Sequence, residues 1–196
     1  MDTLTLNKVI LTTLACNEKS NIDKKYTGVF PIDHISQAEL FVPGELRVCV
    51  LNSQTSSQLG EHWFIVGVDL RHEPFHAFVF DSLAKNLKTN YLSVYNFLKD
   101  NIMQPLEFIL SNRTKFQSDN LDSCSLHVVY FLILILNRNL SFENALQTFY
   151  PDDTLLNDCA LLEKFNDFFS CHSEHALLTR INDQLTSTVD ECTNST

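Results

Sequence analysis

The stretch over residues 61–82 has the sequence EHWFIVGVDLRHEPFHAFVFDS and decides the expected fold. Two runs rich in β-branched and aromatic residues, 62–69 and 76–80, lie on either side of the turn-forming segment 71–74. Such runs favour β-strands, and a short turn between them favours a hairpin. The sequence therefore predicts two neighbouring antiparallel strands at the centre of the molecule.

This hairpin places two polar side chains near one another. With the turn centred between Arg71 and His72, His62 at the start of one strand lies directly opposite Asp81 at the end of the other. Directly opposed side chains are about 5 Å apart at Cβ, so an imidazole N–H can reach a carboxylate. The carboxylate would fix the tautomer of the ring and stabilise the imidazolium. The alternative is that both are polar strand ends that face water.

Outward from the hairpin, hydrophobic periodicity predicts further elements. They are a helix over residues 4–15, an extended segment over 26–33, strands over 46–51 and 106–110, a helix over 91–102, and two later helices with N-caps at Ser141 and Asp152. Together they predict one α+β domain over residues 1–184, with three or four strands in the middle and helices at both ends. Residues 185–196 are Ser/Thr-rich and are expected to form a flexible tail.

The composition excludes several classes of protein. With 44% hydrophobic and 19% charged residues among 196, the chain can form a packed core, which excludes a disordered or fibrous protein. Its four glycines form neither a dinucleotide-binding fingerprint nor a P-loop. A formal charge of −10 excludes a general electrostatic affinity for nucleic acid or for an anionic membrane.

The sequence also bears on the compartment. The longest apolar run, residues 126–136, is shorter than the about 20 residues of a membrane span. The N-terminus lacks the basic and apolar regions of a signal peptide. We therefore expect an intracellular protein whose six cysteines stay reduced. A set of cysteines and histidines near the C-terminus contains no C-x2-C pair, so no metal site is expected there: Cys159, Cys171, His172, His175 and Cys192.

One cysteine lies just before that apolar run. Cys124 follows the helix-starting residues 118–123, so we expect it in the first turn of a buried helix. There the free N–H groups and the positive end of the helix dipole favour the thiolate and lower the pKa of the thiol. The alternative is an inert buried cysteine. His127, one turn later, is expected to be a core or groove residue.

Gln117 lies in the polar loop that leads to this helix. An amide there can donate a hydrogen bond to the oxyanion that forms when a thiolate attacks a carbonyl group. The alternative is a solvated loop residue. Taken together, His62, Asp81, Gln117 and Cys124 supply a base, an orienting acid, an oxyanion donor and a nucleophile.

Three segments in this order resemble the adenain-type cysteine proteases: Gly60-Glu-His62-Trp63, Phe80-Asp81-Ser82 and Gln117-x6-Cys124. That family includes the adenovirus protease and relatives encoded by Polinton/Maverick-like elements and similar viruses, within the wider Ulp/SUMO-protease clan. Residues 26–33 and 48–52 also resemble segments of the transposon-and-virus branch, so the resemblance extends over residues 20–140.

The resemblance implies a rearranged papain-like α+β fold, with a central mixed sheet and a buried helix that carries the nucleophile. By the same resemblance His62 is the general base, Asp81 its orienting acid, Cys124 the nucleophile and Gln117 the oxyanion donor. The implied reaction is hydrolysis of peptide bonds beside small residues, often glycine, with no cofactor and no metal.

The resemblance also concerns two residues around these four. Trp63 is implied to pack over the cysteine–histidine pair. The family usually has glycine directly after the nucleophile, whereas this chain has Ser125. A side chain at that position can crowd the oxyanion hole or narrow the access of substrate.

The resemblance further implies a biological task and partners. The expected task is maturation of viral or virus-like capsid precursors in the cytoplasm or nucleus of a host cell, or within the virion. The expected partners are protein or peptide substrates and, as in the family, a peptide activator. The acidity of the chain argues against DNA as an activator, and no membrane partner is expected. The alternatives are a protease that removes ubiquitin-like modifiers, an acetyltransferase, and a binding module inactivated by Ser125.

Overall fold

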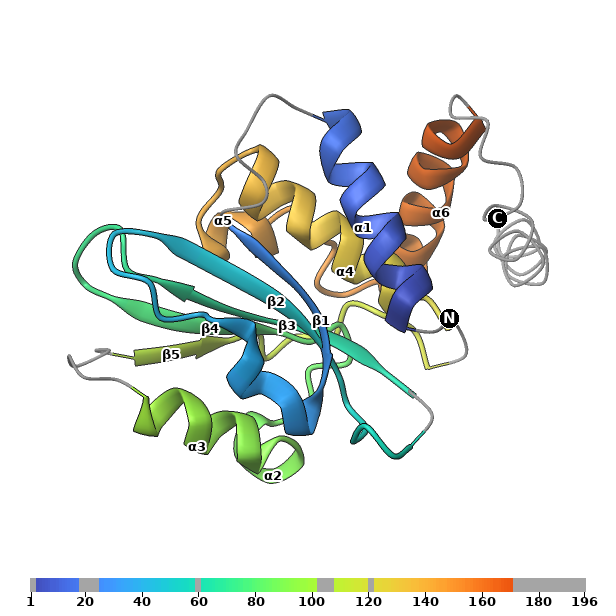
Figure 1. Cartoon of the computed structure of the whole chain (residues 1–196). Helices are drawn as coiled ribbons and strands as arrows, with labels where there is room; N and C mark the ends of the chain where they lie inside the picture. Colours follow the sequence, from blue (N-terminus) through green and yellow to red (C-terminus); the bar gives the residue numbers. More distant parts are fainter. Residues whose placement is uncertain (1–2, 18–24, 59–60, 102–107, 120–121, 171–196) are drawn as a thin grey trace.

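The computed structural model describes residues 3–17, 25–58, 61–101, 108–119 and 122–170 (Figure 1). Its centre is a mixed sheet with the strand order β1-β2-β3-β4-β5. The outer pairs β1–β2 and β4–β5 are parallel, and the inner pairs β2–β3 and β3–β4 are antiparallel. The strands are β1 (Tyr26–Pro31), β2 (Leu46–Asn52), β3 (Trp63–Asp69), β4 (His76–Phe80) and β5 (Phe108–Ser111).

Helices cover both faces of the sheet (Figure 1). They are α1 (Thr3–Asn17), the 3-10 helix η2 (Ile32–Ala38), α2 (Leu87–Asn90), α3 (Leu92–Asp100), α4 (Cys124–Leu132), its π-helical continuation η3 (Ile133–Asn137), α5 (Phe142–Leu146) and α6 (Thr154–Ser170). Buried residues of α1, α4, α5 and α6 form one apolar core with the sheet, and those of η2, α2 and α3 form a second on the opposite face. The two cores hold the central hairpin between them.

The α+β class, the central mixed sheet and the buried helix at Cys124 are confirmed, with five strands instead of three or four. The predicted domain boundary at residue 184 and the tail over 185–196 lie outside the described residues and stay predictions. Within the described ranges, none of the helices combines the length and the apolar character that a bilayer crossing requires.

The predicted hairpin is present, but its register differs from the expectation. Ile65 pairs with Phe80 and Asp69 with His76, so the turn is centred one residue later along the chain. Continued by one pair, this register makes His62 and Asp81 diagonal neighbours rather than directly opposed. The observed and the predicted pairing differ by an even number of residues. Because side chains alternate between the two faces of a strand, His62 and Asp81 stay on the same face of the hairpin.

Two helix predictions differ in detail from the structure. The helix expected over 91–102 corresponds to α3, which begins at Leu92, and the short helix α2 is separated from it at Tyr91, whose backbone (φ −133°) is not helical. The helix after Pro151 begins at Thr154, and the residue that caps it is Asp153, not Asp152, since Asp153 Oδ1 accepts the N–H of Leu156 at 2.8 Å. Ser141 caps α5 as predicted.

The expectation that all six cysteines stay reduced is wrong, as Cys159 shows. Cys49 and Cys124 are free thiols, whereas Cys159 in α6 is disulfide-bonded. A disulfide depends on which Cβ atoms the fold brings within about 4.5 Å of each other, and the spacing of cysteines along the chain does not reveal this.

Candidate active site

The hydrogen bond predicted between His62 and Asp81 is present. The distance from His62 Nε2 to Asp81 Oδ1 is 2.7 Å, and both side chains are buried, with 3% and 2% of their surface exposed. Because Nε2 faces the carboxylate, a neutral ring carries its proton on Nε2 and its lone pair on Nδ1. The ring is therefore held as a base whose accepting atom is Nδ1.

Further donors hold the Asp81 carboxylate. Oδ1 also accepts the N–H of Leu83 at 2.8 Å, and Oδ2 accepts the hydroxyl of Tyr91 at 2.8 Å. Burial by itself raises the pKa of Asp81, but the hydrogen bonds from His62, Tyr91 and Leu83 outweigh burial and lower it. Asp81 is therefore a fixed negative charge beside the imidazole.

Tyr91 is the first residue of the helix predicted over residues 91–102, and that prediction assigns it no part in the site. In the structure its ring stacks on Phe64, with the centroids 4.2 Å apart, while its hydroxyl reaches Asp81. The break between α2 and α3 at Tyr91 is thus the point at which this side chain contacts the site. The sequence contains no direct sign of this contact, because the contact depends on how α3 packs on the sheet.

Asn112 is a second residue that the sequence analysis missed. Its Oδ1 accepts the N–H of Asp81 at 2.9 Å, and its Nδ2 donates to the Asp81 carbonyl at 2.6 Å. Asn112 directly follows β5, which runs parallel to β4, so the two strands end side by side. The side-chain amide therefore holds the backbone of Asp81 through one accepted and one donated hydrogen bond, the pattern that a paired strand would provide.

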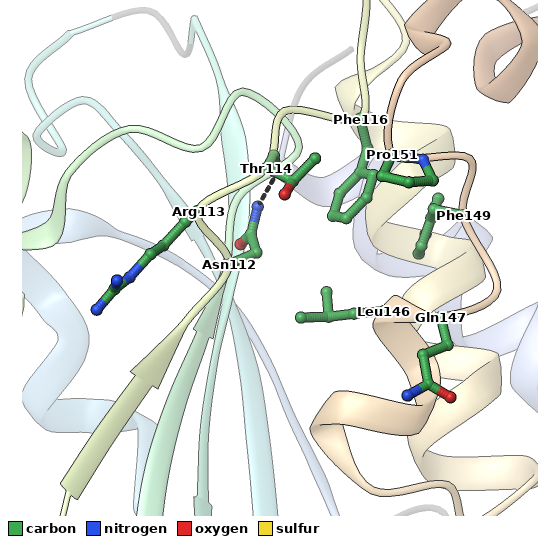
Figure 2. A pocket seen from close by; sticks show the side chains of 8 residues that line it. All are labelled: Asn112, Arg113, Thr114, Phe116, Leu146, Gln147, Phe149 and Pro151. Carbon is green, nitrogen blue, oxygen red and sulfur yellow. Dashed lines mark hydrogen bonds between the residues drawn. The ribbon is translucent and has the colours of Figure 1, made fainter.

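A pocket of about 370 Å³ adjoins this part of the molecule (Figure 2). Asn112 and Phe116 belong both to its wall and to the hydrogen-bond network around Asp81 and Ser82. The candidate catalytic side chains do not line it, so it neighbours the candidate site without being its cleft. The lining residues are Asn112, Arg113, Thr114, Phe116, Leu146, Gln147, Phe149 and Pro151.

Gln117 is buried, with 5% of its surface exposed, so the alternative of a solvated loop residue is wrong. Its Oε1 accepts the hydroxyl of Ser82 at 2.7 Å, and the carbonyl of Ser82 accepts the N–H groups of Phe116 and Gln117. Since a hydroxyl donates to the amide oxygen, the amide NH2 is directed away from Ser82. Ser82 therefore orients the candidate oxyanion donor, a role that the sequence analysis did not assign.

Cys124 is the first residue of α4, as predicted, and follows Ser123 at the N-cap position. The thiol is 4% exposed and approaches Asp122 Oδ1 at 4.0 Å. Burial raises the pKa of Cys124 to about 11, with a further increase from Asp122, while backbone hydrogen bonds from Trp63 and Ser125 lower it. The expected lowering of this pKa is thus wrong, because desolvation outweighs the helix N-terminus in the resting structure.

Cys124 lies close to the histidine-bearing strand. The backbone of Trp63, the residue directly after His62, is near enough to the sulfur to lower the pKa of the thiol. Cys124 is in turn near enough to Tyr91 to raise the pKa of the phenol, together with burial and Asp81. The structure therefore brings the cysteine to the same end of β3 and β4 as the His62–Asp81 pair.

Trp63 and Ser125 are the residues that follow His62 and Cys124 in the chain. Trp63 is buried, and its side chain belongs with Cys124 to the apolar core between the sheet and α4. Ser125 is half-buried in the first turn of α4. Among the residues that the structure describes, no group of three histidine, cysteine or acidic side chains is placed to hold a metal ion. Of the C-terminal cysteine and histidine set, only Cys159 lies in that part of the chain.

The fold has counterparts among solved structures. A de-sumoylating protease matches with a TM-score of 0.50 and 11% sequence identity, over 100% of this chain and 85% of its own. The fold is that of the Ulp-type, papain-like cysteine proteases. The ASFV pS273R protease matches with a TM-score of 0.42 and 22% identity over 55% of this chain and 40% of its own, so the matched region spans well under half of that protease.

A third match is HopZ1a, solved in complex with IP6, with a TM-score of 0.46 and 14% identity over 76% of this chain and 47% of its own. No protein-family model matches the chain, and a comparison with curated proteins finds no significant match. The similarity to this group of cysteine proteases therefore concerns the fold. The predicted affiliation with the Polinton-like branch stays a prediction.

Proposed function

We propose that this chain is a cysteine protease in which Cys124 is the nucleophile, His62 the general base and Asp81 the orienting acid. The observation that carries the proposal is the buried 2.7 Å hydrogen bond from His62 Nε2 to Asp81, next to Trp63, whose backbone is near enough to the Cys124 sulfur to lower the pKa of the thiol. A base oriented by a carboxylate and placed beside a thiol is the arrangement that nucleophilic catalysis on a carbonyl group needs.

The resting thiol is protonated, because burial holds its pKa near 11. In the proposed reaction His62 Nδ1 removes the proton as the sulfur forms a bond to the peptide carbonyl carbon. The carbon–nitrogen bond then breaks, and His62 returns the proton to the leaving amine. A water molecule deprotonated by His62 next attacks the thioester and releases the carboxyl product together with the free thiol.

Gln117 supplies the second part of the proposed machinery. Its amide NH2, directed by the hydrogen bond from Ser82 to Oε1, donates to the oxyanion together with the backbone N–H of Cys124. Such donors stabilise the charge that develops on the carbonyl oxygen during attack. Ser125 lies beside this position, and its hydroxymethyl group narrows the hole relative to glycine.

The test is covalent labelling by a peptide vinyl sulfone at neutral pH, read by intact mass and peptide mapping. The wild-type chain should take up one label, on Cys124, and the Cys124→Ser variant none. Cys49, the other free cysteine among the described side chains, is fully buried in β2, so a Cys49→Ser variant is the matched control and should label like wild type. A folded wild-type chain that takes up no label at Cys124 would refute the proposal.

We further propose that the substrates are structural precursors of a virus or virus-like element, cut beside small residues inside the host cell. The support is the resemblance carried by His62-Trp63, Asp81 and Gln117-x6-Cys124. Turnover of capsid-precursor peptides, measured beside a Gly-Gly-ended modifier fused to a reporter, tests this. Preference for the modifier would indicate deconjugation instead, and acetyl-CoA-dependent labelling of Cys124 would indicate acyl transfer.

A further inference from the structure

Two buried titratable side chains lie outside the proposed machinery. His127 is on α4, one turn after the cysteine, and Asp158 is on α6; neither has exposed surface. Their nearest charged atoms, His127 Nε2 and Asp158 Oδ1, are 3.6 Å apart. Burying such a pair costs free energy unless both side chains make hydrogen bonds. The hydrogen-bond partners of the two side chains therefore show which segments of the chain the pair holds in place.

Asp158 binds two points of one loop. Its Oδ2 accepts the backbone N–H of Ser118 at 2.9 Å, and its Oδ1 accepts the hydroxyl of Ser123 in a short hydrogen bond. Ser118 directly follows Gln117, and Ser123 directly precedes Cys124. One carboxylate therefore holds the neighbour of the proposed oxyanion donor and the neighbour of the proposed nucleophile.

His127 contacts the same two segments. Its Nε2 lies 3.3 Å from the carbonyl oxygen of Phe116, and its Nδ1 lies 3.1 Å from the carbonyl oxygen of Ser123. A carbonyl oxygen only accepts, so the neutral ring donates to one of these two carbonyl groups through its single N–H. Burial lowers the pKa of His127 and raises the pKa of Asp158, although the attraction between the two groups opposes both shifts.

We propose that His127 and Asp158 form a buried clamp of positioning residues, which fixes the separation between Gln117 and Cys124 so that both meet one substrate carbonyl. This inference rests on the proposed protease function. Displacement of the loop by even 1 Å would take the amide out of hydrogen-bond reach of the oxyanion without changing the cysteine itself.

The neighbouring residue on α6 provides a matched control. Asn157 is also buried, 3% exposed, but among the described residues its amide bonds only the backbone of Tyr150, through Oδ1 to the N–H and through Nδ2 to the carbonyl, each at 2.8 Å. It fixes the turn before α6 and touches neither Gln117 nor Cys124. Asn157→Ala should therefore remove a comparable pair of hydrogen bonds without disturbing the proposed spacing.

The experiment compares two cysteine reagents on wild type, Asp158→Ala, Asp158→Asn and Asn157→Ala. Iodoacetamide alkylates the thiol without forming an oxyanion, whereas a peptide aldehyde forms a hemithioacetal whose oxygen needs the oxyanion donors. We expect Asp158→Ala to lower the affinity for the peptide aldehyde about tenfold or more, while the rate of alkylation by iodoacetamide changes by less than about threefold. Asn157→Ala should change neither.

Asp158→Asn keeps the inference testable if the alanine variant does not fold. Its Oδ1 can still accept from Ser118, and its NH2 can donate to the hydroxyl of Ser123, so both links survive without the charge. We expect aldehyde affinity within about fivefold of wild type, because one neutral hydrogen bond contributes about 1 kcal/mol to such a difference. Loss of aldehyde affinity in Asp158→Asn as large as that expected for alanine would overturn the clamp.

The outcomes for the two proposals are separable. Wild-type protein that binds no aldehyde and whose Cys124 is not labelled refutes the protease function itself. Wild-type protein that binds aldehyde while Asp158→Ala binds it equally well refutes only the clamp. Equal loss of both readouts in Asp158→Ala and in Asn157→Ala would also overturn it, since α6 would then act by general stability alone.

Discussion

The two halves of the candidate site differ in how far the resting fold prepares them. On the hairpin side, Asp81 accepts hydrogen bonds from His62, Tyr91 and Leu83, and these bonds lower its pKa. On the helix side, burial raises the pKa of Cys124 to about 11 despite its place at the N-terminus of α4. The proposed base is therefore oriented in advance, whereas the proposed nucleophile becomes reactive only when its proton is removed.

This contrast shows that a position at a helix N-terminus does not by itself lower the pKa of a buried thiol. The free N–H groups at the start of a helix stabilise a thiolate when water or a cation also surrounds it. Cys124 is 4% exposed, and the nearest described charge on its own loop is the negative Asp122 at 4.0 Å. The dipole alone does not overcome desolvation and a like charge.

The largest expected effect comes from breaking the hairpin side. Asp81→Asn keeps the size of the side chain but presents an amide to His62, which disfavours the tautomer with its lone pair on Nδ1. We expect kcat/KM for peptide cleavage to fall about 10,000-fold. A loss below about tenfold would show that Asp81 does not orient the base.

The same variant has a consequence for stability. The pKa of Asp81 is lowered in the fold, so its contribution to the free energy of unfolding is present above the pKa of an unfolded aspartate, about 3.9, and is lost as pH falls through the lower folded value. Asp81→Asn should therefore flatten the acid side of the stability profile, measured by urea unfolding between pH 6 and the lowest pH at which the wild type stays folded.

On the helix side, pH should control the reactivity of Cys124 over a wide range. With a pKa near 11, the thiolate fraction rises tenfold with each pH unit below that value, so iodoacetamide alkylation should accelerate about 100-fold between pH 8 and pH 10. Cys124→Ser supplies the background rate. A rate that is already constant from pH 8 upward would mean that His62 and Cys124 form an ion pair at rest. The helix side would then be prepared at rest as the hairpin side is.

The sequence reveals those parts of the fold and of the candidate site that residues close together in the chain determine. It does not reveal the parts that depend on residues brought together only by folding. Runs of β-branched and aromatic residues predicted the strands of the hairpin, and the apolar run after Cys124 predicted a buried helix that starts there. The register was wrong because it depends on where the turn is centred, which composition does not fix. Asn112 and Asp158 were missed because only the pairing of β4 with β5 and the packing of α6 bring them to the site.

A smaller effect is expected for the phenol that supports Asp81. Tyr91→Phe removes the hydroxyl that donates to Oδ2 at 2.8 Å and keeps the stacking on Phe64. The loss of one hydrogen bond should reduce kcat about fivefold with little change in KM. Phe64→Leu, which alters the stack and leaves the hydroxyl, is the control. An unchanged kcat in Tyr91→Phe would show that the other donors to the carboxylate suffice.

The smallest effect is expected at the residue after the nucleophile. Ser125→Gly removes a half-buried hydroxymethyl group beside the proposed oxyanion hole and restores the residue usual in the resembling family. We expect an increase in kcat/KM of about twofold, within the range of substitutions that leave the core intact. A rise of a hundredfold would instead identify Ser125 as the reason for a weakened enzyme.

The end of β4 has a consequence for how such a site can be altered. Asp81 orients the proton acceptor and Ser82, its neighbour in the chain, orients the amide of Gln117, so consecutive residues align the two halves of the proposed reaction. Anything that shifts this strand terminus therefore disturbs both hydrogen bonds together. Inserting a single residue between the two would separate them, because the side chains would then leave the backbone in new directions.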